Sequence, residues 1–176
     1  MRFTETKLSG AWLIEPEPFE DERGFFARVF CFDEFSAHGL ETSFVQHSMS
    51  GNANTGTLRG MHYQKAPHEE VKLVGCTNGA IYDVIIDLRH GSPTYKQWQG
   101  FELTSENKNR LYVPKGFAHG FQTLADDTHV FYLISAFYTP EASTGVAHDD
   151  AAFGISWPLP ITTISEKDQN WPAFTT

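Results

Sequence analysis

The stretch Lys72-Leu73-Val74-Gly75-Cys76-Thr77-Asn78-Gly79-Ala80-Ile81-Tyr82-Asp83-Val84-Ile85-Ile86-Asp87-Leu88 decides the fold class. Two apolar runs rich in β-branched residues flank Asn78-Gly79, a dipeptide that supplies both positive-φ residues of a type I′ turn. This pattern predicts a β-hairpin. Other strand-like runs cover residues 24–32, 57–63, 98–103, 110–113 and 129–138. Many short strands at this spacing predict an all-β sandwich or barrel of the jelly-roll type.

Helical patterns are confined to two short segments. Residues 32–38, followed by Gly39 as a left-handed stop, predict one short helix. Residues 165–170, which precede Trp171-Pro172, predict another turn or two. Because the sequence has no internal repeat, low-complexity segment or linker, we expect a single domain over residues 1–176.

The composition excludes several classes of protein. Residues of the AVILMFWYC set make up 40% and charged residues 20%, as in soluble globular proteins. No apolar run approaches the roughly 20 residues that span a bilayer, so we expect no membrane contact. The N-terminal residues lack an apolar signal segment, and Cys31 and Cys76 cannot build a disulfide framework, so we expect a cytoplasmic protein. The net charge of −9 argues against a nucleic-acid partner but permits a local cationic pocket for a small anion.

A metal site is the first chemistry to weigh. The run Pro114-Lys115-Gly116-Phe117-Ala118-His119 resembles the Pro-x-Gly-x-x-His motif of cupin barrels, whose histidine is a metal ligand in the metalloenzymes. Those enzymes add a His-x-His pair, whereas Gln64 stands here two residues after His62. His68, Glu69 and Glu70 are possible ligands, but three or four well-placed ones are needed. We expect no metal, and a metal-dependent cupin enzyme using His62, His119 and a glutamate is the alternative.

Arg59 and His62 stand inside a run that otherwise has the pattern of a barrel wall. Their spacing of three puts them on opposite faces of a regular strand. Gly60 permits a bulge or a close backbone approach that would bring both side chains inward. Without such a bulge, the pair is one exposed arginine and one buried histidine.

Tyr132 and Tyr138 share one face of the predicted strand 129–138. At about 3.3 Å per residue they would lie roughly 20 Å apart, so both could contact only an elongated ligand. The alternative is that both tyrosines fill the core or an edge of the fold.

Seven motifs in order resemble the dTDP-4-dehydrorhamnose 3,5-epimerase family, the RmlC-like cupins. They are residues 21–26, 56–64, 72–74, 87–94, 114–121, 154–158 and 165–168. The resemblance covers nearly the whole chain. It implies a cupin-type jelly-roll β-barrel with a few short helices and without metal or cofactor. It also implies a homodimer that acts on a nucleotide-linked 4-keto-6-deoxy sugar.

The resemblance also implies roles for individual residues. His62 would be the base that removes a proton next to the ketone, Asp168 its orienting partner, and Tyr132 the proton donor on the opposite face. The substrate contacts would be Lys72 and His119 near the sugar, Arg23 and Arg59 at the diphosphate, Tyr138 on the thymine, and Gln46.

The chain departs from the family pattern at several positions, one of them, Arg28, expected near the sugar. Arg28 stands where many members have Glu, residues 47–50 replace an Asn-containing run, and Ser143 aligns with an occasional Glu. Inversion at C3, at C5 or at both therefore stays open. A single-centre C3 epimerase, a 3,4-ketoisomerase and a non-catalytic sugar-nucleotide binder are the alternatives.

Overall fold

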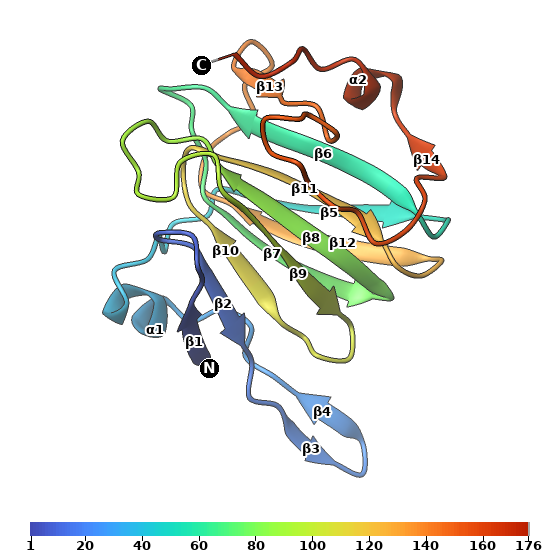
Figure 1. Ribbon diagram of the computed structural model, residues 1–176. Coiled ribbons are helices and arrows are strands. Elements are labelled where there is room, and N and C mark those ends of the chain that lie inside the picture. Colours follow the sequence, from blue (N-terminus) through green and yellow to red (C-terminus); the bar gives the residue numbers. More distant parts are fainter. Residues whose placement is uncertain (176) are drawn as a thin grey trace.

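The computed structural model describes residues 1–175 and consists mainly of two β-sheets packed face to face (Figure 1). The first sheet has the order β1 (Arg2–Glu5), β2 (Trp12–Glu15), β10 (Arg110–Val113), β7 (Lys72–Asn78), β12 (Thr128–Ile134) and β5 (Gln46–Asn52). The second has the order β13 (Ser143–Gly145), β6 (Thr57–Gln64), β11 (Phe117–Thr123), β8 (Ala80–Asp87) and β9 (Trp98–Thr104), and β14 (Thr163–Ile164) pairs with β6. The predicted all-β architecture is confirmed.

Four short elements complete the described chain. β3 (Phe19–Asp21) and β4 (Gly24–Phe26) form a separate two-stranded hairpin, which projects from the body of the molecule (Figure 1). The helices α1 (Phe32–Ala37) and α2 (Glu166–Gln169) confirm both helix predictions. None of the helices within residues 1–175 is long and apolar enough to cross a membrane.

The main hydrophobic core lies between the two sheets. Val74 of β7, Ile85 of β8 and Phe121 of β11 are each at most 2% exposed and belong to this cluster. The outer face of the second sheet is also covered, because Val146 and Phe153 of the C-terminal segment pack against Val84. Strands that are buried on both faces have nearly continuous apolar sequences rather than alternating ones. Residues 80–86 of β8 follow this pattern.

The Asn78-Gly79 hairpin prediction is wrong, although both of its strands exist. β7 pairs with β10 and β12 in the first sheet, whereas β8 pairs with β9 and β11 in the second. Asn78 continues β7 opposite His129, and only Gly79 of the dipeptide has a positive φ, +74°. A Cβ on Gly79 would lie 2.4 Å from Thr128 Oγ1, so the glycine makes a tight corner between the sheets. The sequence signal marks a chain reversal and does not say which strands pair.

Two predicted strands end early. The run 24–32 is a strand only over Gly24–Phe26, and Phe32 begins α1. The run 129–138 ends as a strand at Ile134. The Ser135 amide still donates to the Val71 carbonyl at 3.0 Å, but the Val71 amide donates to the side-chain Oγ of Ser135, at 2.8 Å, instead of to its backbone. The estimate of 20 Å between Tyr132 and Tyr138 therefore does not apply. The runs 57–63, 98–103 and 110–113 are confirmed as β6, β9 and β10.

Candidate active site

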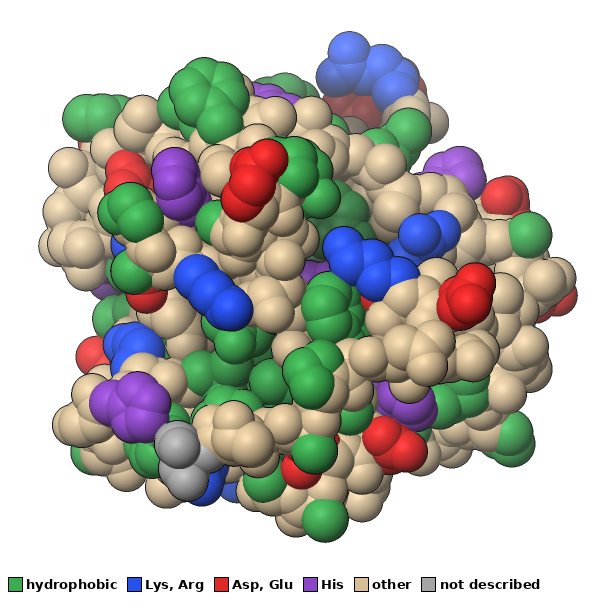
Figure 2. All heavy atoms as spheres, turned by 90° about the horizontal axis from the view of Figure 1, so that it is seen from above, with side chains coloured by type: hydrophobic (Ala, Val, Ile, Leu, Met, Phe, Trp, Pro, Cys, Tyr) green, Lys and Arg blue, Asp and Glu red, His purple; other side chains and the backbone are tan. Residues whose placement is uncertain are grey.

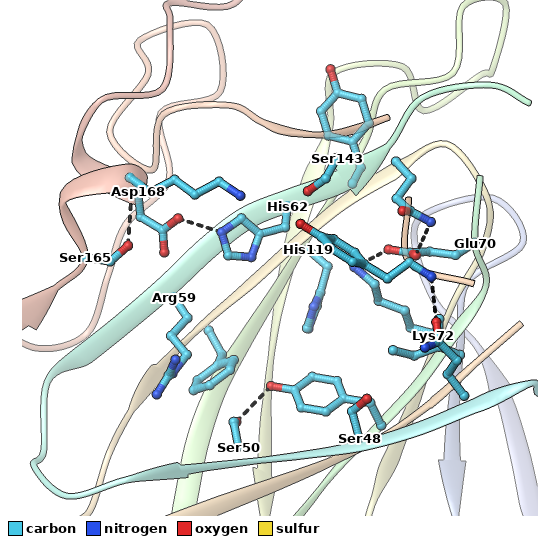
Figure 3. A pocket seen from close by; sticks show the side chains of 18 residues that line it. Ser48, Ser50, Arg59, His62, Glu70, Lys72, His119, Ser143, Ser165 and Asp168 are labelled. Atoms are coloured by element: carbon cyan, nitrogen blue, oxygen red, sulfur yellow. Dashed lines mark hydrogen bonds and ion pairs between the residues drawn. The ribbon is translucent and has the colours of Figure 1, made fainter. Parts of the chain in front are cut away.

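A cavity of about 440 Å³ lies between the sheets, lined by strands of both and by α2 (Figure 3). It gathers all the predicted site residues except Arg23, namely Gln46, Arg59, His62, Lys72, His119, Tyr132, Tyr138 and Asp168. These residues come from β5, β6, β7, β11, β12, α2 and the segment after β12. The fold therefore brings together groups that lie more than 120 positions apart, from Gln46 to Asp168.

Gly60 explains how Arg59 and His62 reach the same cavity. His119 of β11 pairs with His62, and Phe121 pairs with Arg59. Between these pairs β6 has two residues where β11 has only one, which is a β-bulge. Gly60 has a φ of +150°, and a Cβ there would lie 2.6 Å from the Cα of Gly120. Only glycine fits both the conformation and the contact. The bulge considered from the sequence is present.

His62 and Asp168 form a hydrogen-bonded pair at the cavity wall, with 2.6 Å between Nε2 and Oδ1 (Figure 3). Asp168 is 4% exposed, and its Oδ2 accepts the Gly60 amide at 3.3 Å. The carboxyl sits on α2, whose first turn is capped by Ser165: the Asp168 amide donates to Ser165 Oγ at 3.1 Å. Asp168 of α2, 106 positions from His62 in the sequence, thus fixes the imidazole.

The environment keeps Asp168 ionised. Burial alone would raise the pKa of this carboxyl, but the hydrogen bonds from His62, Gly60 and Ser165 outweigh burial and lower the pKa below its usual value. A carboxylate only accepts, so Nε2 of His62 carries the hydrogen. Nδ1 then holds the lone pair, and no hydrogen bond joins it to another residue within 1–175. This arrangement presents Nδ1 as a base.

Tyr132 supplies an acidic group in the same cavity. Its ring packs against the main core, and its hydroxyl lies 3.1 Å from Ser50 Oγ. Burial raises the pKa of the phenol far above its usual value, and the hydrogen bond from Ser50 offsets only part of that effect. The phenol is therefore protonated at neutral pH and can donate a proton.

Lys72 is ion-paired inside the cavity. Its Nζ lies 3.0 Å from Glu70 Oε1, and the two side chains are only 12% and 13% exposed. Gln64 Nε2 donates to the other oxygen of Glu70, at 2.8 Å. Glu70, one of the possible metal ligands, is thus occupied by an ammonium and an amide. Within residues 1–175 no group of three or more His, Cys, Asp or Glu side chains could hold a metal ion.

His119 is held from behind by a second carboxylate. Its Nε2 lies 2.7 Å from Oδ1 of Asp83, a fully buried residue of β8. The sequence analysis missed Asp83, although a lone carboxylate inside the apolar run 80–86 was a visible signal. The His119 ring meets the Tyr132 ring edge-on, 6.4 Å between centroids. His119 is therefore oriented toward the same space as Tyr132.

Gln46 and Tyr138 meet at the rim of the cavity. The backbone amide of Tyr138 donates to Gln46 Oε1 at 2.6 Å, and the tyrosine is 60% exposed. Gln46 thus fixes the segment that carries Tyr138, in addition to lining the cavity itself. The exposed ring is free to stack on a flat ligand.

Cations collect at this cavity although the chain is acidic overall. Arg59, Lys72 and Lys167 all line it. Arg59 donates to Asn52 Oδ1 at 2.7 Å and to the Gly51 carbonyl at 3.2 Å, and it has no carboxylate partner among the described residues. On the face seen in Figure 2, basic side chains are scattered among acidic and apolar ones. The local cationic pocket that the sequence permits is present.

Comparison with known proteins identifies the family of this chain. A family model described as dTDP-4-dehydrorhamnose 3,5-epimerase matches residues 5–176. The chain belongs to this family. A dTDP-4-dehydrorhamnose 3,5-epimerase of Methanothermobacter thermautotrophicus is 44% identical over 97% of the chain and 92% of that protein. The resemblance inferred from the motifs is confirmed.

Solved structures of the family share the whole fold. The Bacillus anthracis epimerase, crystallised with TDP and PPi, is 43% identical with a TM-score of 0.95, over 98% of this chain and 99% of that one. The Legionella pneumophila epimerase, in complex with dTDP-4-keto-L-rhamnose, is 37% identical with a TM-score of 0.90, over 95% and 89%. The cupin-type jelly roll is therefore confirmed.

Arg23 is the predicted epimerase residue that lies apart from the cavity. It stands in the turn between β3 and β4, 85% of its side chain is exposed, and it pairs with Asp21. Arg28 also lies elsewhere, beside Glu34 at 3.5 Å. The predicted contact between Arg23 and a diphosphate in this cavity is therefore not made within a single chain.

Sequence reasoning missed some residues of the epimerase cavity. Lys167 lines it directly before Asp168, with Nζ 5.2 Å from the centre of the Trp171 ring. Its position beside the predicted carboxylate was the available signal. Ser48 and Ser50 of β5 also line the cavity, and the departure of residues 47–50 from the family pattern was the available signal.

Proposed function

We propose that this protein epimerises dTDP-4-dehydro-6-deoxyglucose, or a close nucleotide-linked 4-keto-6-deoxy sugar, by removing and replacing a proton next to the ketone. The observation that carries this proposal is the His62–Asp168 pair, at 2.6 Å, in one cavity with Tyr132. Family membership supports the same activity. The isomerisation transfers no net electrons.

His62 is the proposed base. Nδ1 takes the proton from the carbon next to the ketone, and the buried carboxylate of Asp168 stabilises the imidazolium that forms. The electron pair moves onto the carbonyl oxygen, where the Lys72 ammonium and His119 stabilise the enolate. Tyr132 then gives its hydroxyl proton to the opposite face of the same carbon, which inverts the centre.

The remaining cavity residues suit the nucleotide. Arg59 is a planar donor without a carboxylate partner in the described chain, which fits a diphosphate. Tyr138 offers an exposed ring at the rim for the thymine, and Gln46 holds its backbone. Lys167 adds charge beside the dyad.

We also propose a single-domain chain that works as a homodimer in the cytoplasm. The projecting β3–β4 hairpin exposes Phe19, Phe25 and Phe26 by 79%, 59% and 73%, which is unfavourable unless another surface covers them. Packing this hairpin on a second copy would bring Arg23 toward the partner's cavity. Mixing inactive Arg23→Ala with inactive His62→Ala should restore activity in mixed dimers, because one of their two sites has both residues. Absence of any recovery after subunit exchange would contradict this arrangement.

The activity is tested by incubating the keto sugar with the protein in deuterium oxide. We expect deuterium at C3 and C5 by mass spectrometry, and loss of exchange in His62→Ala. Exchange at C3 alone would identify a single-centre epimerase. Binding of dTDP without any exchange, across the available nucleotide 4-keto sugars, would refute the proposal in favour of a binding module.

A further inference from the structure

The edge strand β5 supplies the hydrogen-bond partner of the phenol that serves as the acid. Ser50 Oγ lies 3.1 Å from the Tyr132 hydroxyl, and this is the only hydrogen bond of that hydroxyl within residues 1–175 (Figure 3). Neither residue belongs to the base side of the cavity, where His62 and Asp168 lie. Ser50 therefore acts on one of the two proton transfers and not on the other.

The register of β5 and β12 explains the contact. Tyr132 is paired with Ser48, and Ser50 is paired with Val130, one step further along the same face. The tyrosine side chain leans along the strand across the small Ser48 and reaches Ser50 with its hydroxyl. Diagonal neighbours of this kind lie within reach of an aromatic side chain. Two serines on this face thus leave room for the ring and fix its end.

The ring itself is held by packing. It lies against the core cluster that contains Val74 and Val130, and the His119 ring meets it edge-on. Packing sets the plane of the ring, but it does not set where the hydroxyl proton points. That direction depends on the hydrogen-bond partner of the hydroxyl, which is Ser50.

We propose that Ser50 is a positioning residue that makes Tyr132 an effective proton donor and so favours inversion over simple return of the proton. This inference rests on the proposed epimerase activity. As Tyr132 gives its proton to carbon, its oxygen becomes a phenolate. Ser50 then donates its hydroxyl hydrogen into that oxygen while keeping its own O–H bond. A hydrogen bond to a charged group is stronger than one between neutral groups, so the contact strengthens during the transfer.

The enolate has two outcomes that can be measured separately. Return of a proton from His62 regenerates the substrate, with solvent deuterium if the imidazolium has exchanged. Delivery of a proton from Tyr132 gives the inverted product. The ratio of deuterium in recovered substrate to inverted product therefore reports the balance between the two faces. General damage to the fold lowers both and leaves the ratio unchanged.

The test is this ratio for Ser50→Ala and Ser50→Thr in deuterium oxide. We expect Ser50→Ala to raise the ratio about tenfold or more, the value of one hydrogen bond to a charged group. Ser50→Thr keeps the hydroxyl and should restore the ratio to within about twofold. Tyr132→Phe gives the upper limit, and Met49→Leu, an exposed change on the same strand, is the matched control.

The possible results distinguish failure of the inference about Ser50 from failure of the proposed activity. A wild-type ratio in Ser50→Ala, or equal losses of exchange and inversion, would overturn the inference while leaving the epimerase activity intact. Absence of exchange in the unmodified protein would instead refute the proposed function. Should Ser50→Ala be unstable, Ser50→Cys carries a thiol of similar size that bonds weakly. It is expected to raise the ratio in the same direction.

Discussion

Replacing Asp168 by asparagine is expected to impair catalysis more than replacing it by alanine. In the structure Oδ2 of Asp168 accepts the Gly60 amide, at 3.3 Å, while Oδ1 faces Nε2 of His62 at 2.6 Å. An asparagine keeps its carbonyl oxygen on the Gly60 amide, so its NH₂ group faces His62. That group donates to Nε2, which forces the hydrogen onto Nδ1 and removes the lone pair needed for proton abstraction.

The magnitude follows from two terms. Both variants lose the hydrogen bond between the carboxylate and the imidazolium, about 1.5–3 kcal/mol, or a tenfold to hundredfold lower rate. Turning the amide of Asp168→Asn to the favourable orientation would set NH₂ against the Gly60 N–H, at a cost of about 1–3 kcal/mol. The wrong tautomer then dominates by roughly fivefold to a hundredfold. Asp168→Asn should therefore be slower than Asp168→Ala by that factor.

The assay is the initial rate of deuterium incorporation at C3 of saturating substrate, measured for the unmodified protein and both variants. Thermal unfolding of each variant serves as the control, because loss of a buried carboxylate also affects stability. A rate for Asp168→Asn equal to or above that of Asp168→Ala would refute the assignment of Nδ1 as the base. It would also refute the tautomer that the Gly60 contact imposes.

Three other substitutions test the β-bulge, a substrate contact and a buried carboxylate. Gly60→Ala should destabilise the protein by about 2 kcal/mol or more, seen as a lower Tm, because its Cβ would lie 2.6 Å from the Gly120 Cα; an unchanged Tm would contradict the bulge. Arg59→Lys should raise KM about tenfold with little change in kcat, since a single ammonium replaces a planar donor; a loss confined to kcat would exclude a purely binding role. Burial raises the pKa of Asp87, but hydrogen bonds from Arg89, Ser92 and Thr94 outweigh this and lower it from 3.8 to about 2. The free energy of unfolding should therefore exceed that of Asp87→Asn by about 2 kcal/mol above pH 4, as measured by denaturant titration. This difference should disappear as the pH falls toward 2, and a difference independent of pH would contradict the prediction.

Strand content was predictable from the sequence because it depends on local pattern. The apolar run before Asp87 and the turn at Gly116 each identify strands without reference to the rest of the chain. His62, Tyr132 and Asp168 were predicted through the order of the family motifs. Their gathering in one cavity follows from the fold.

Strand pairing and side-chain partners were not predictable in the same way. Asn78-Gly79 has the composition of a hairpin turn, yet its strands enter different sheets because each finds better neighbours there. The partner of His119, Asp83, depends on the pairing of β11 with β8 in the second sheet. The partner of Lys72, Glu70, lies just before the start of β7. Arg23 lies on a hairpin that projects from the rest of the described chain, so contacts within this chain do not place it at the cavity.

The corner at Gly79 also has a consequence for how the protein is made. Because the chain passes repeatedly between the two sheets from β5 to β13, the first sheet draws on chain from Arg2 to Ile134 and needs its late strands before its early ones are covered. Such non-local pairing slows folding, and strands waiting for partners are prone to aggregate. Asp168 emerges from the ribosome after every strand of both sheets. The proposed base, His62, therefore gains its carboxylate partner last, and a chain that ends before residue 168 is expected to be inactive.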